Sequence, residues 1–395
     1  PCRIDVYCEN MLFGQAVYGA RPGVQVLPYD SMYGNRMMYD LILWVEHFIH
    51  VLSWNAYRAA KICPEFADKI RILGKSIKNI RPEIEQQWFR EAMQFRRCQL
   101  LGINRWTELR HGSVFQIPDQ YSYIDLKTQC LSRIRELNLL DCRYITINRG
   151  SDGMGRTTVQ TKVWPKEHYE RLVSLFKKKY RAIKVIQLGT ANNVRISGAD
   201  GYMLGESMEV TKWVLRGSML HIDCEGGLVH LAAQLAVTCI VLFGPTPAHM
   251  YAYPANINLV SHKCSNCMGT HPDWAFSCYK GFKDPECMYS LTADHVMSHI
   301  ENFMNEKGRQ REKEITQIDI QIDSENQKHF DLLEIYKKCR SKNQQLTISK
   351  KYKRLYTKVL EQTENSISPM KVAVVDAGRD FIGWYLAELG LSVTE

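Results

Sequence analysis

The chain has 395 residues, of which 45% are hydrophobic and 24% charged, and its formal net charge is +9. This length suits two or three domains, the composition is that of a globular protein, and no run of about 18 uncharged apolar residues is present that would cross a bilayer. The basic charge is compatible with phosphorylated substrates, anionic membrane surfaces or nucleic acid. No nucleic-acid-binding motif accompanies it, so we expect no nucleic-acid partner.

Thirteen cysteines are spread along the chain, and its first residues have neither a methionine nor the basic and apolar regions of a signal peptide. Cysteines in this number without a secretory signal favour a reducing compartment over a disulfide scaffold. We interpret the sequence as a fragment of a cytoplasmic protein.

The first region, residues 1–130, is predicted to be an α/β domain. Residues 3–7 and 24–27 are typical of short strands, and the apolar, aromatic-rich run from about Met37 to Cys63 favours a helix. The strand signals of this region are weaker than those that follow.

A regular alternation of strand and helix patterns begins at Arg143, within a second domain assigned to residues 131–307. Strands are predicted at 144–148, 184–188, 219–223 and 239–243, and helices at 166–179, 208–217, 227–236 and 292–307. This alternation predicts a doubly wound parallel sheet, whose ligands bind beyond the carboxyl ends of the strands. The loop at 149–165 and the glycine turn at 225–227 both fall there, so we expect them to form one crevice.

The last part of the chain changes in composition. Residues 308–369 are rich in charged and amide side chains and are predicted to form a helical or partly disordered connector. The apolar run that begins at Met370, followed by Gly378 and Gly383, resembles the first strand, turn and helix of another α/β domain. We therefore assign residues 370–395 to the start of a further α/β domain.

The glycine turn is a candidate phosphate site. Glu225, Gly226 and Gly227 follow a strand, and the helix after them carries His230 on its first turn. Glycine lets a ligand approach the backbone, while the N–H groups and dipole of a helix start favour an anion such as a diphosphate. The alternative is structural: glycine is common at strand-to-helix turns, and a lone histidine is more often a packed core residue.

The loop before the helix at 166–179 holds a second candidate group. Its sequence includes Thr157, Thr158, Lys162 and Trp164. The ammonium of Lys162 would neutralise a diphosphate, and the two threonine hydroxyls would donate hydrogen bonds to it. The alternative is that Trp164 packs in the core and Lys162 points into water.

Taken together, these motifs resemble family 9 glycosyltransferases, the heptosyltransferase-like enzymes of bacterial lipopolysaccharide assembly, over about residues 142–302. The resemblance is carried by Thr-Thr…Lys-x-Trp-Pro, Glu-Gly-Gly-x-x-His and Phe243-Gly-Pro-Thr246. Glu225 stands where the family has Asp, which puts its contact with the sugar or nucleotide in doubt, and Asp223 is a candidate to share that role. Asn193 lies where members carry an acidic residue near the ribose.

The resemblance implies a GT-B fold, in which two Rossmann-like domains face a cleft, the first binding the acceptor and the second the nucleotide-sugar donor. It implies inverting transfer without a catalytic metal, and it places Thr157, Thr158, Lys162, Asn193, Glu225, Gly226, Gly227 and His230 at the donor. The family's catalytic base is an Asp just after the first strand. Because residues 3–7 resemble the second strand, the first strand and the base are expected to be missing, and no residue is assigned as base.

A cysteine-rich segment, residues 264–287, follows the last predicted strand of the second domain. Its four thiols belong to Cys264, Cys267, Cys278 and Cys287. A C-x-x-C pair followed by two more cysteines, with glycines and a proline between them, suits a structural tetrahedral site for zinc or iron. Protein-heptosylating relatives of the family carry a comparable iron-binding finger. The alternative is four plain thiols.

The sequence therefore predicts a glycosyltransferase that moves a sugar, heptose by resemblance, from ADP-heptose to lipopolysaccharide, a surface glycan or a protein in the bacterial cytoplasm. Its basic charge would favour peripheral contact with the anionic inner membrane. The alternative function is a non-catalytic nucleotide-sugar-binding or scaffolding module fused to another enzyme. A dinucleotide-dependent oxidoreductase is disfavoured because no G-x-G-x-x-G turn follows a first strand.

Overall fold

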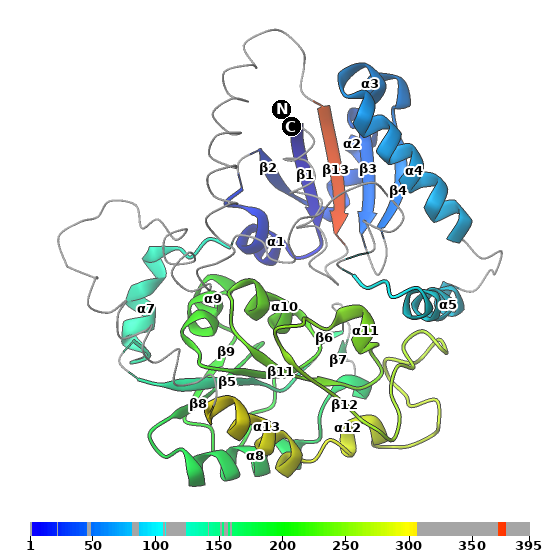
Figure 1. The fold of residues 1–395 in the computed structure, drawn as a ribbon. Helices are drawn as coiled ribbons and strands as arrows, with labels where there is room; N and C mark the ends of the chain where they lie inside the picture. Colours follow the sequence, from blue (N-terminus) through cyan, green and yellow to red (C-terminus); the bar gives the residue numbers. More distant parts are fainter. Residues whose placement is uncertain are drawn as a thin grey trace.

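The structure, a computed structural model, describes residues 2–21, 23–45, 49–80, 87–105, 107, 124–140, 142–150, 152–153, 157–158, 160–305 and 370–376. These residues form two α/β domains, each built on its own sheet, and Figure 1 shows one sheet above the other. The prediction of an α/β protein with a parallel sheet is confirmed.

The first sheet has five strands in the order β2-β1-β13-β3-β4. Its strands are β1 (Cys2–Cys8), β2 (Val24–Pro28), β3 (Leu41–Val45), β4 (Ile49–Trp54) and β13 (Met370–Asp376). The helices of this domain are α1 (Met11–Tyr18), α2 (Met32–Asn35), α3 (Ala56–Ile62), α4 (Pro64–Ile80) and α5 (Gln87–Leu100), with short 3₁₀ turns at Tyr29–Ser31 and Arg36–Met38. All neighbouring strands run parallel except β3 and β4, which are antiparallel.

The prediction for the aromatic-rich run of the first domain is wrong. Most of it forms the hairpin of β3 and β4, and helix α3 begins only at Ala56. Leu41, Ile42 and Leu43 are all buried. A strand that is buried on both faces has a continuous apolar sequence, which periodicity alone does not distinguish from a buried helix. The strands predicted at 3–7 and 24–27 are confirmed as β1 and β2.

Strand β13 lies in the middle of the first sheet. Val374 pairs with Val6 of β1 on one side and with Leu43 of β3 on the other, both in parallel register. The described residues of the segment 370–395 thus join the first sheet, which differs from the further domain expected there. The sequence of β13 is short and apolar. Such a sequence suits a central strand of a parallel sheet, because these sheets are covered on both faces. The connector 308–369 lies outside the described residues, and the domain boundaries stay predictions.

The second sheet is parallel throughout and has six strands in the order β12-β11-β10-β5-β8-β9. Its strands are β5 (Tyr144–Asn148), β8 (Lys184–Gly189), β9 (Gly201–Leu204), β10 (His221–Cys224), β11 (Cys239–Phe243) and β12 (Ile257–Val260). Its helices are α7 (Leu131–Glu136), α8 (Lys166–Lys179), α9 (Met208–Gly217), α10 (Gly227–Gln234), α11 (Ala248–Tyr251), α12 (Glu286–Tyr289) and α13 (Ala293–Phe303). There are also 3₁₀ turns at Thr128–Cys130 and Gln160–Lys162 and a separate pair of short strands, β6 (Asp152–Gly153) and β7 (Thr157–Thr158). The predicted strands and helices of this domain are confirmed within a few residues.

The strand order of the second sheet creates a switch point between β5 and β10. After β5 the chain continues through β8 and β9 on one side and then returns to β10 on the other. Loops that leave β5 and β10 therefore diverge at the carboxyl ends of these strands, which is where ligands of such sheets bind. In Figure 1, α8 and α13 cover the face of the sheet turned away from the first domain, while α9 and α10 lie between the sheets.

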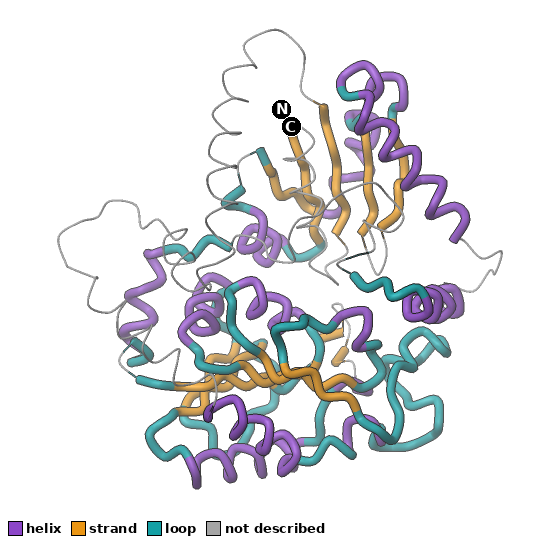
Figure 2. The backbone as a smooth tube through the Cα atoms, in the orientation of Figure 1, coloured by secondary structure: helices purple, strands orange, loops and turns teal. Residues whose placement is uncertain are grey.

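Polar contacts between described residues join the two domains on both sides of the molecule. Lys212 of α9 is buried and donates to the backbone oxygen of Ala16 in α1 at 2.9 Å. On the other side of the molecule the Arg105 N–H donates to the backbone oxygen of Met250 in α11 at 3.0 Å. Figure 2 shows helices and loops, rather than a continuous sheet, between the two sets of strands. The domains also share apolar packing, because one buried cluster contains Val17 of α1 together with Val214 of α9 and Leu231 of α10, whereas the face of the second sheet beneath α8 and α13 has a separate core.

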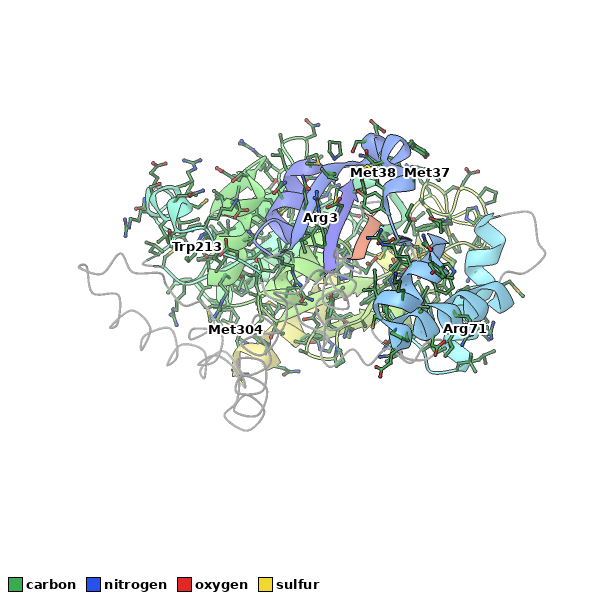
Figure 3. The ribbon with its side chains drawn as sticks, turned by 90° about the horizontal axis from the view of Figure 1, so that it is seen from above. Arg3, Met37, Met38, Arg71, Trp213 and Met304 are labelled. Carbon is green, nitrogen blue, oxygen red and sulfur yellow. The ribbon has the colours of Figure 1, made fainter. Side chains whose placement is uncertain are left out.

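Some large apolar side chains of the first domain face solvent. Met37 is 96% exposed and Met38 is 57% exposed, and in the view from above both lie at the edge of the first domain (Figure 3). Among the helices that the structure describes, none combines the length and apolar character needed to cross a bilayer.

Candidate functional site

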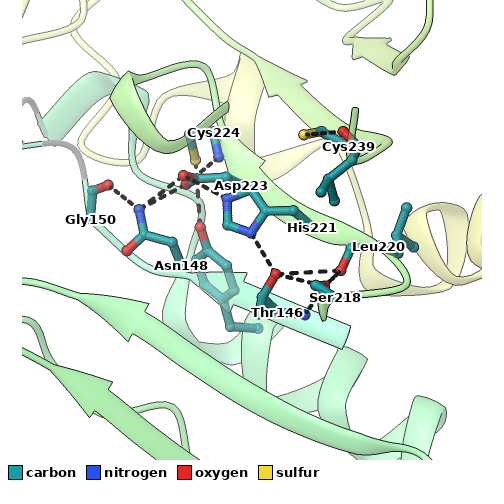
Figure 4. A network of polar contacts seen from close by, with 11 residues as sticks. Thr146, Asn148, Gly150, Ser218, Leu220, His221, Asp223, Cys224 and Cys239 are labelled. Atoms are coloured by element: carbon teal, nitrogen blue, oxygen red, sulfur yellow. Dashed lines mark hydrogen bonds and ion pairs between the residues drawn. The ribbon is translucent and has the colours of Figure 1, made fainter. Parts of the chain in front are cut away.

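The two strands at the switch point are joined by a buried amide and a buried carboxylate (Figure 4). Asn148 ends β5, and its Nδ2 donates to both carboxylate oxygens of Asp223 in β10, at 3.1 and 3.0 Å. The same amide donates to the backbone oxygen of Gly150 at 3.0 Å. These bonds fix the start of the loop after β5 against the end of β10, directly below the glycine turn.

A histidine continues this network into the sheet. His221 Nε2 lies 3.4 Å from Asp223 Oδ2, and its Nδ1 lies 3.0 Å from Thr146 Oγ1, which contacts the Ser218 hydroxyl at 2.9 Å. Burial raises the pKa of Asp223, while His221 and Asn148 oppose that rise. The sequence analysis did not single out Asn148 or His221. Their signal is a polar residue at alternate positions of otherwise apolar strands.

Helix α10 begins at the glycine turn without a side-chain cap. The first N–H groups of a helix have no partner within it and carry partial positive charge. A Cβ at Gly227 would meet none of the described atoms within 4 Å, and one at Gly226 would meet only the Cys224 backbone oxygen at 3.9 Å. Neither packing against the described atoms nor a positive φ requires glycine here, and the lack of a side chain leaves the backbone of the turn accessible to close approach.

Lys162, Glu225 and His230 come together at this helix start. Lys162 Nζ lies 2.5 Å from Glu225 Oε2, and His230 Nε2 lies 3.3 Å from Glu225 Oε1. Burial acts to raise the pKa of Glu225, but Lys162 and His230 outweigh it and the pKa of the carboxyl is lowered. Glu225 is therefore ionised and holds a cation and an imidazole beside the helix amides. The alternative in which Lys162 points into water is wrong, since its side chain is 15% exposed.

The position of Lys162 depends on the residues on either side of it. Thr161 Oγ1 donates to the backbone oxygen of Trp274 at 2.9 Å, which fastens the loop to the cysteine-rich segment. Trp164 is fully buried, and its Nε1 donates to the backbone oxygen of Leu291 at 2.7 Å. The packing role considered for Trp164 is therefore confirmed, and that packing holds Lys162 beside Glu225. The sequence analysis did not identify Thr161, because a single threonine in a loop forms no recognisable motif.

His230 has a further buried contact on its other side. Its Nδ1 lies 3.1 Å from the Tyr253 hydroxyl, and Gln234 Nε2 donates to the same hydroxyl at 3.4 Å. All three side chains are at most 4% exposed. The sequence analysis did not include Tyr253 or Gln234.

The remaining donor-binding candidates are placed differently. The backbones of Thr157 and Thr158 form β7, but their side chains lie outside the described residues. Asn193 lies at the carboxyl end of β8, where its Oδ1 accepts from the Thr190 N–H at 2.6 Å. A Cβ at Gly150 or at Gly189 would come within 2.2 Å of this amide, so Asn193 packs between the loops after β5 and β8. Its direct contact in the structure is with its own loop.

The cysteine-rich segment brings its thiols near one another. Burial, followed by Cys264 and Cys267, raises the pKa of Cys287 to about 12, and burial, followed by Cys278 and Cys264, raises that of Cys267 to about 11. Within the described residues, however, no three His, Cys, Asp or Glu side chains are grouped as metal ligands would be. The four-cysteine metal site stays a prediction.

The chain matches no protein-family model and no protein of curated function. Among solved structures it is similar to E. coli ADP-heptose lipopolysaccharide heptosyltransferase II, with 13% identity and a TM-score of 0.45 over 78% of this chain and 99% of that one. It is similar to a family 9 glycosyltransferase from Veillonella parvula, with 12% identity and a TM-score of 0.40 over 77% and 98% of the two chains. It is also similar to the iron-containing dodecameric glycosyltransferase TibC from enterotoxigenic E. coli, with 17% identity and a TM-score of 0.36 over 42% of this chain. That match spans about half of TibC, 48% of its length. All three carry the names of enzymes in the family that the sequence motifs resemble.

Proposed function

We propose that the second domain binds the diphosphate of a nucleotide sugar and that the protein is an inverting glycosyltransferase. One observation supports this most strongly: Lys162 lies beside the uncapped glycine start of α10, at the switch point of a parallel sheet. A primary ammonium and unpaired helix amides are the groups that stabilise a departing diphosphate. The imidazole of His230 lies at the same place and has a ring N–H group that can donate a hydrogen bond.

In this proposal the acceptor hydroxyl attacks the anomeric carbon from the side opposite the diphosphate. The bond from the anomeric carbon to the diphosphate oxygen breaks, and the charge that develops on that oxygen is stabilised by Lys162 and the α10 amides. A base must take the proton of the acceptor hydroxyl, and we assign no residue to that role. Glu225 holds Lys162 in the ligand-free protein, so a bound diphosphate competes with it for the ammonium.

The finer identity of the substrates rests on the motif resemblance. We propose heptose carried on ADP as donor, and lipopolysaccharide, a surface glycan or a protein as acceptor, in the bacterial cytoplasm. The structure of TibC in complex with ADP-D-β-D-heptose is named for that donor. The net charge of +9 would favour peripheral contact with an anionic membrane surface.

Calorimetric titration with ADP-heptose, UDP-sugars and GDP-sugars tests the donor site. We expect preferential binding of one donor, weakened about tenfold or more in Lys162→Ala because a charge-assisted phosphate contact is removed. Lys178→Ala is the matched control, since Lys178 is an exposed lysine at the far end of α8. Absence of binding to every nucleotide sugar would contradict the proposal.

A non-catalytic nucleotide-sugar-binding module is the second candidate. The Asn193 amide stands where the resemblance places an acidic residue, and it is already engaged by the Thr190 N–H of its own loop. Incubating the protein with a bound donor and following release of the nucleoside diphosphate distinguishes the two. Release that Lys162→Ala slows establishes turnover, whereas binding without release favours the module.

We also propose that Cys264, Cys267, Cys278 and Cys287 bind one structural zinc or iron ion. The influence of Cys264 on both Cys267 and Cys287, and of Cys278 on Cys267, supports this because it requires the thiols to lie near one another, and cysteine thiolates are the usual ligands of structural zinc. Elemental analysis should find about one metal ion per chain, absent from Cys264→Ser but present in Cys142→Ser, a partly exposed cysteine outside the segment. The proposal would be contradicted if wild-type protein without metal were as stable as wild-type protein supplied with zinc or iron.

A further inference from the structure

Three buried side chains, those of Gln234, Tyr253 and His230, follow one another behind the helix start. Gln234 Nε2 donates to the Tyr253 hydroxyl, the hydroxyl faces His230 Nδ1, and His230 Nε2 faces the carboxylate of Glu225. Tyr253 is fully buried and is contributed by the loop after α11, whereas Gln234 and His230 lie one turn apart on α10.

The direction of these bonds follows from the charge at one end. Glu225 lies beside the ammonium of Lys162, and an ionised carboxylate can only accept hydrogen bonds. The ring nitrogen that faces this carboxylate must carry a proton, because a lone pair there would be repelled by the negative oxygen. A neutral imidazole with a proton on Nε2 accepts at Nδ1, so the hydroxyl of Tyr253 donates to it. The hydroxyl oxygen then accepts from Gln234, which agrees with the observed contact.

We propose that Tyr253 and Gln234 are positioning residues that hold His230 in the tautomer with its proton on Nε2, so that the ring faces Glu225 with an N–H group and keeps this carboxylate and Lys162 in place at the diphosphate site. The step to the diphosphate rests on the function proposed above. A second group that orients the far nitrogen of a histidine is the usual way in which proteins select one tautomer. Tyr253 acts only through His230 and does not touch the ligand.

Nitrogen NMR of the ligand-free protein measures the tautomer directly. We expect the wild-type His230 ring to carry its proton on Nε2, and Tyr253→Phe to shift a measurable fraction to the Nδ1 form. Tyr144→Phe is the control, because it removes another buried hydroxyl, which donates to the Val214 backbone oxygen within the same domain. If Tyr253→Phe does not fold, Gln234→Met should shift the tautomer in the same direction by less. A wild-type ring protonated on Nδ1, or a tautomer unchanged in both variants, overturns the proposal.

Inorganic pyrophosphate then serves as the binding probe. Tyr253→Phe should weaken its binding about three- to tenfold, the effect of one hydrogen bond. In His230→Gln the amide nitrogen replaces Nε2 and needs no tautomer, so adding Tyr253→Phe should have little further effect. Equal weakening in both backgrounds would show a purely structural role for Tyr253 and overturn the proposal. Absence of pyrophosphate binding by the wild type would instead contradict the proposed function, while the NMR result still decides the role of Tyr253.

Discussion

The two sheets of this protein are assembled in opposite ways. The second takes its six strands from one continuous stretch, residues 144–260, in which helices separate most of the strands. The first takes four strands from residues 2–54 and its central strand from residues 370–376. The second sheet is therefore specified by a local repeat of strand and helix, whereas the first depends on pairing between segments that are distant in the sequence.

We expect the largest effect from a proline in the central strand of the first sheet. Val374→Pro removes a ladder N–H from a strand with a neighbour on each side, which should lower the free energy of unfolding of the first domain by about 3 kcal/mol or more. Val260→Pro, at the end of edge strand β12, is the matched control with a smaller effect on the second domain. Hydrogen exchange, measured at increasing denaturant concentration, gives the free energy of unfolding of each domain. Equal protection of β1 in wild type and Val374→Pro would contradict the central position of β13.

The next largest effect concerns the ion pair between Glu225 and Lys162 in the second domain. Glu225→Gln removes the buried partner of Lys162 and should lower the free energy of unfolding of the second domain by about 1.5–3 kcal/mol at pH 7. Glu167→Gln, an exposed change in the first turn of α8, should have a much smaller effect.

The pH dependence of Glu225→Gln has a definite sign. Because the folded protein lowers the pKa of Glu225, its stabilising contribution is complete above the unfolded pKa of about 4.3 and declines as the pH falls below that value. The difference in stability between wild type and Glu225→Gln should thus be the same at pH 7 and pH 5 and should shrink below about pH 4. A difference that already declines between pH 7 and pH 5 would show that Glu225 is not held ionised by Lys162.

The smallest effect concerns the contact between the domains. Lys212→Met removes the bond from Nζ to the Ala16 backbone oxygen, at an expected cost of about 0.5–1.5 kcal/mol, since an apolar side chain of similar length also avoids burying an ammonium. The thermal transitions of the two domains should move apart in calorimetry. Lys184→Met, an exposed change at the start of β8, serves as control. Unchanged transitions would mean that Lys212 does not couple the domains.

The sequence predicted four of the six strands of the second sheet, because most of these strands are followed by a turn and a helix with its own pattern, but it did not predict β9 and β12. Gly226, Gly227, Lys162 and His230 were predicted from these turns, and the structure brings them to one helix start. The prediction did not extend to Tyr253, because its contact with His230 is made by a loop whose sequence has no period.

The first domain was predicted less well for a physical reason. Leu41, Ile42 and Leu43 of β3 are apolar at consecutive positions, and their burial on both faces of the sheet removes the alternation that distinguishes a strand. The place of β13 depends on a gap between β1 and β3 that only the three-dimensional arrangement reveals. Asn193 is a similar case, because its packing against Gly150 and Gly189 depends on loops from separate strands.

The central position of β13 has a consequence for folding during synthesis. A chain made from its N-terminus presents β1 and β3 early, but the strand that joins them emerges only after the whole second domain. The second domain can therefore fold first, while the first sheet waits in two halves with unpaired edges that invite pairing with other chains. Pairing between segments so distant in the sequence is slow. We therefore expect the second domain to be native on the ribosome before the two halves of the first sheet are joined.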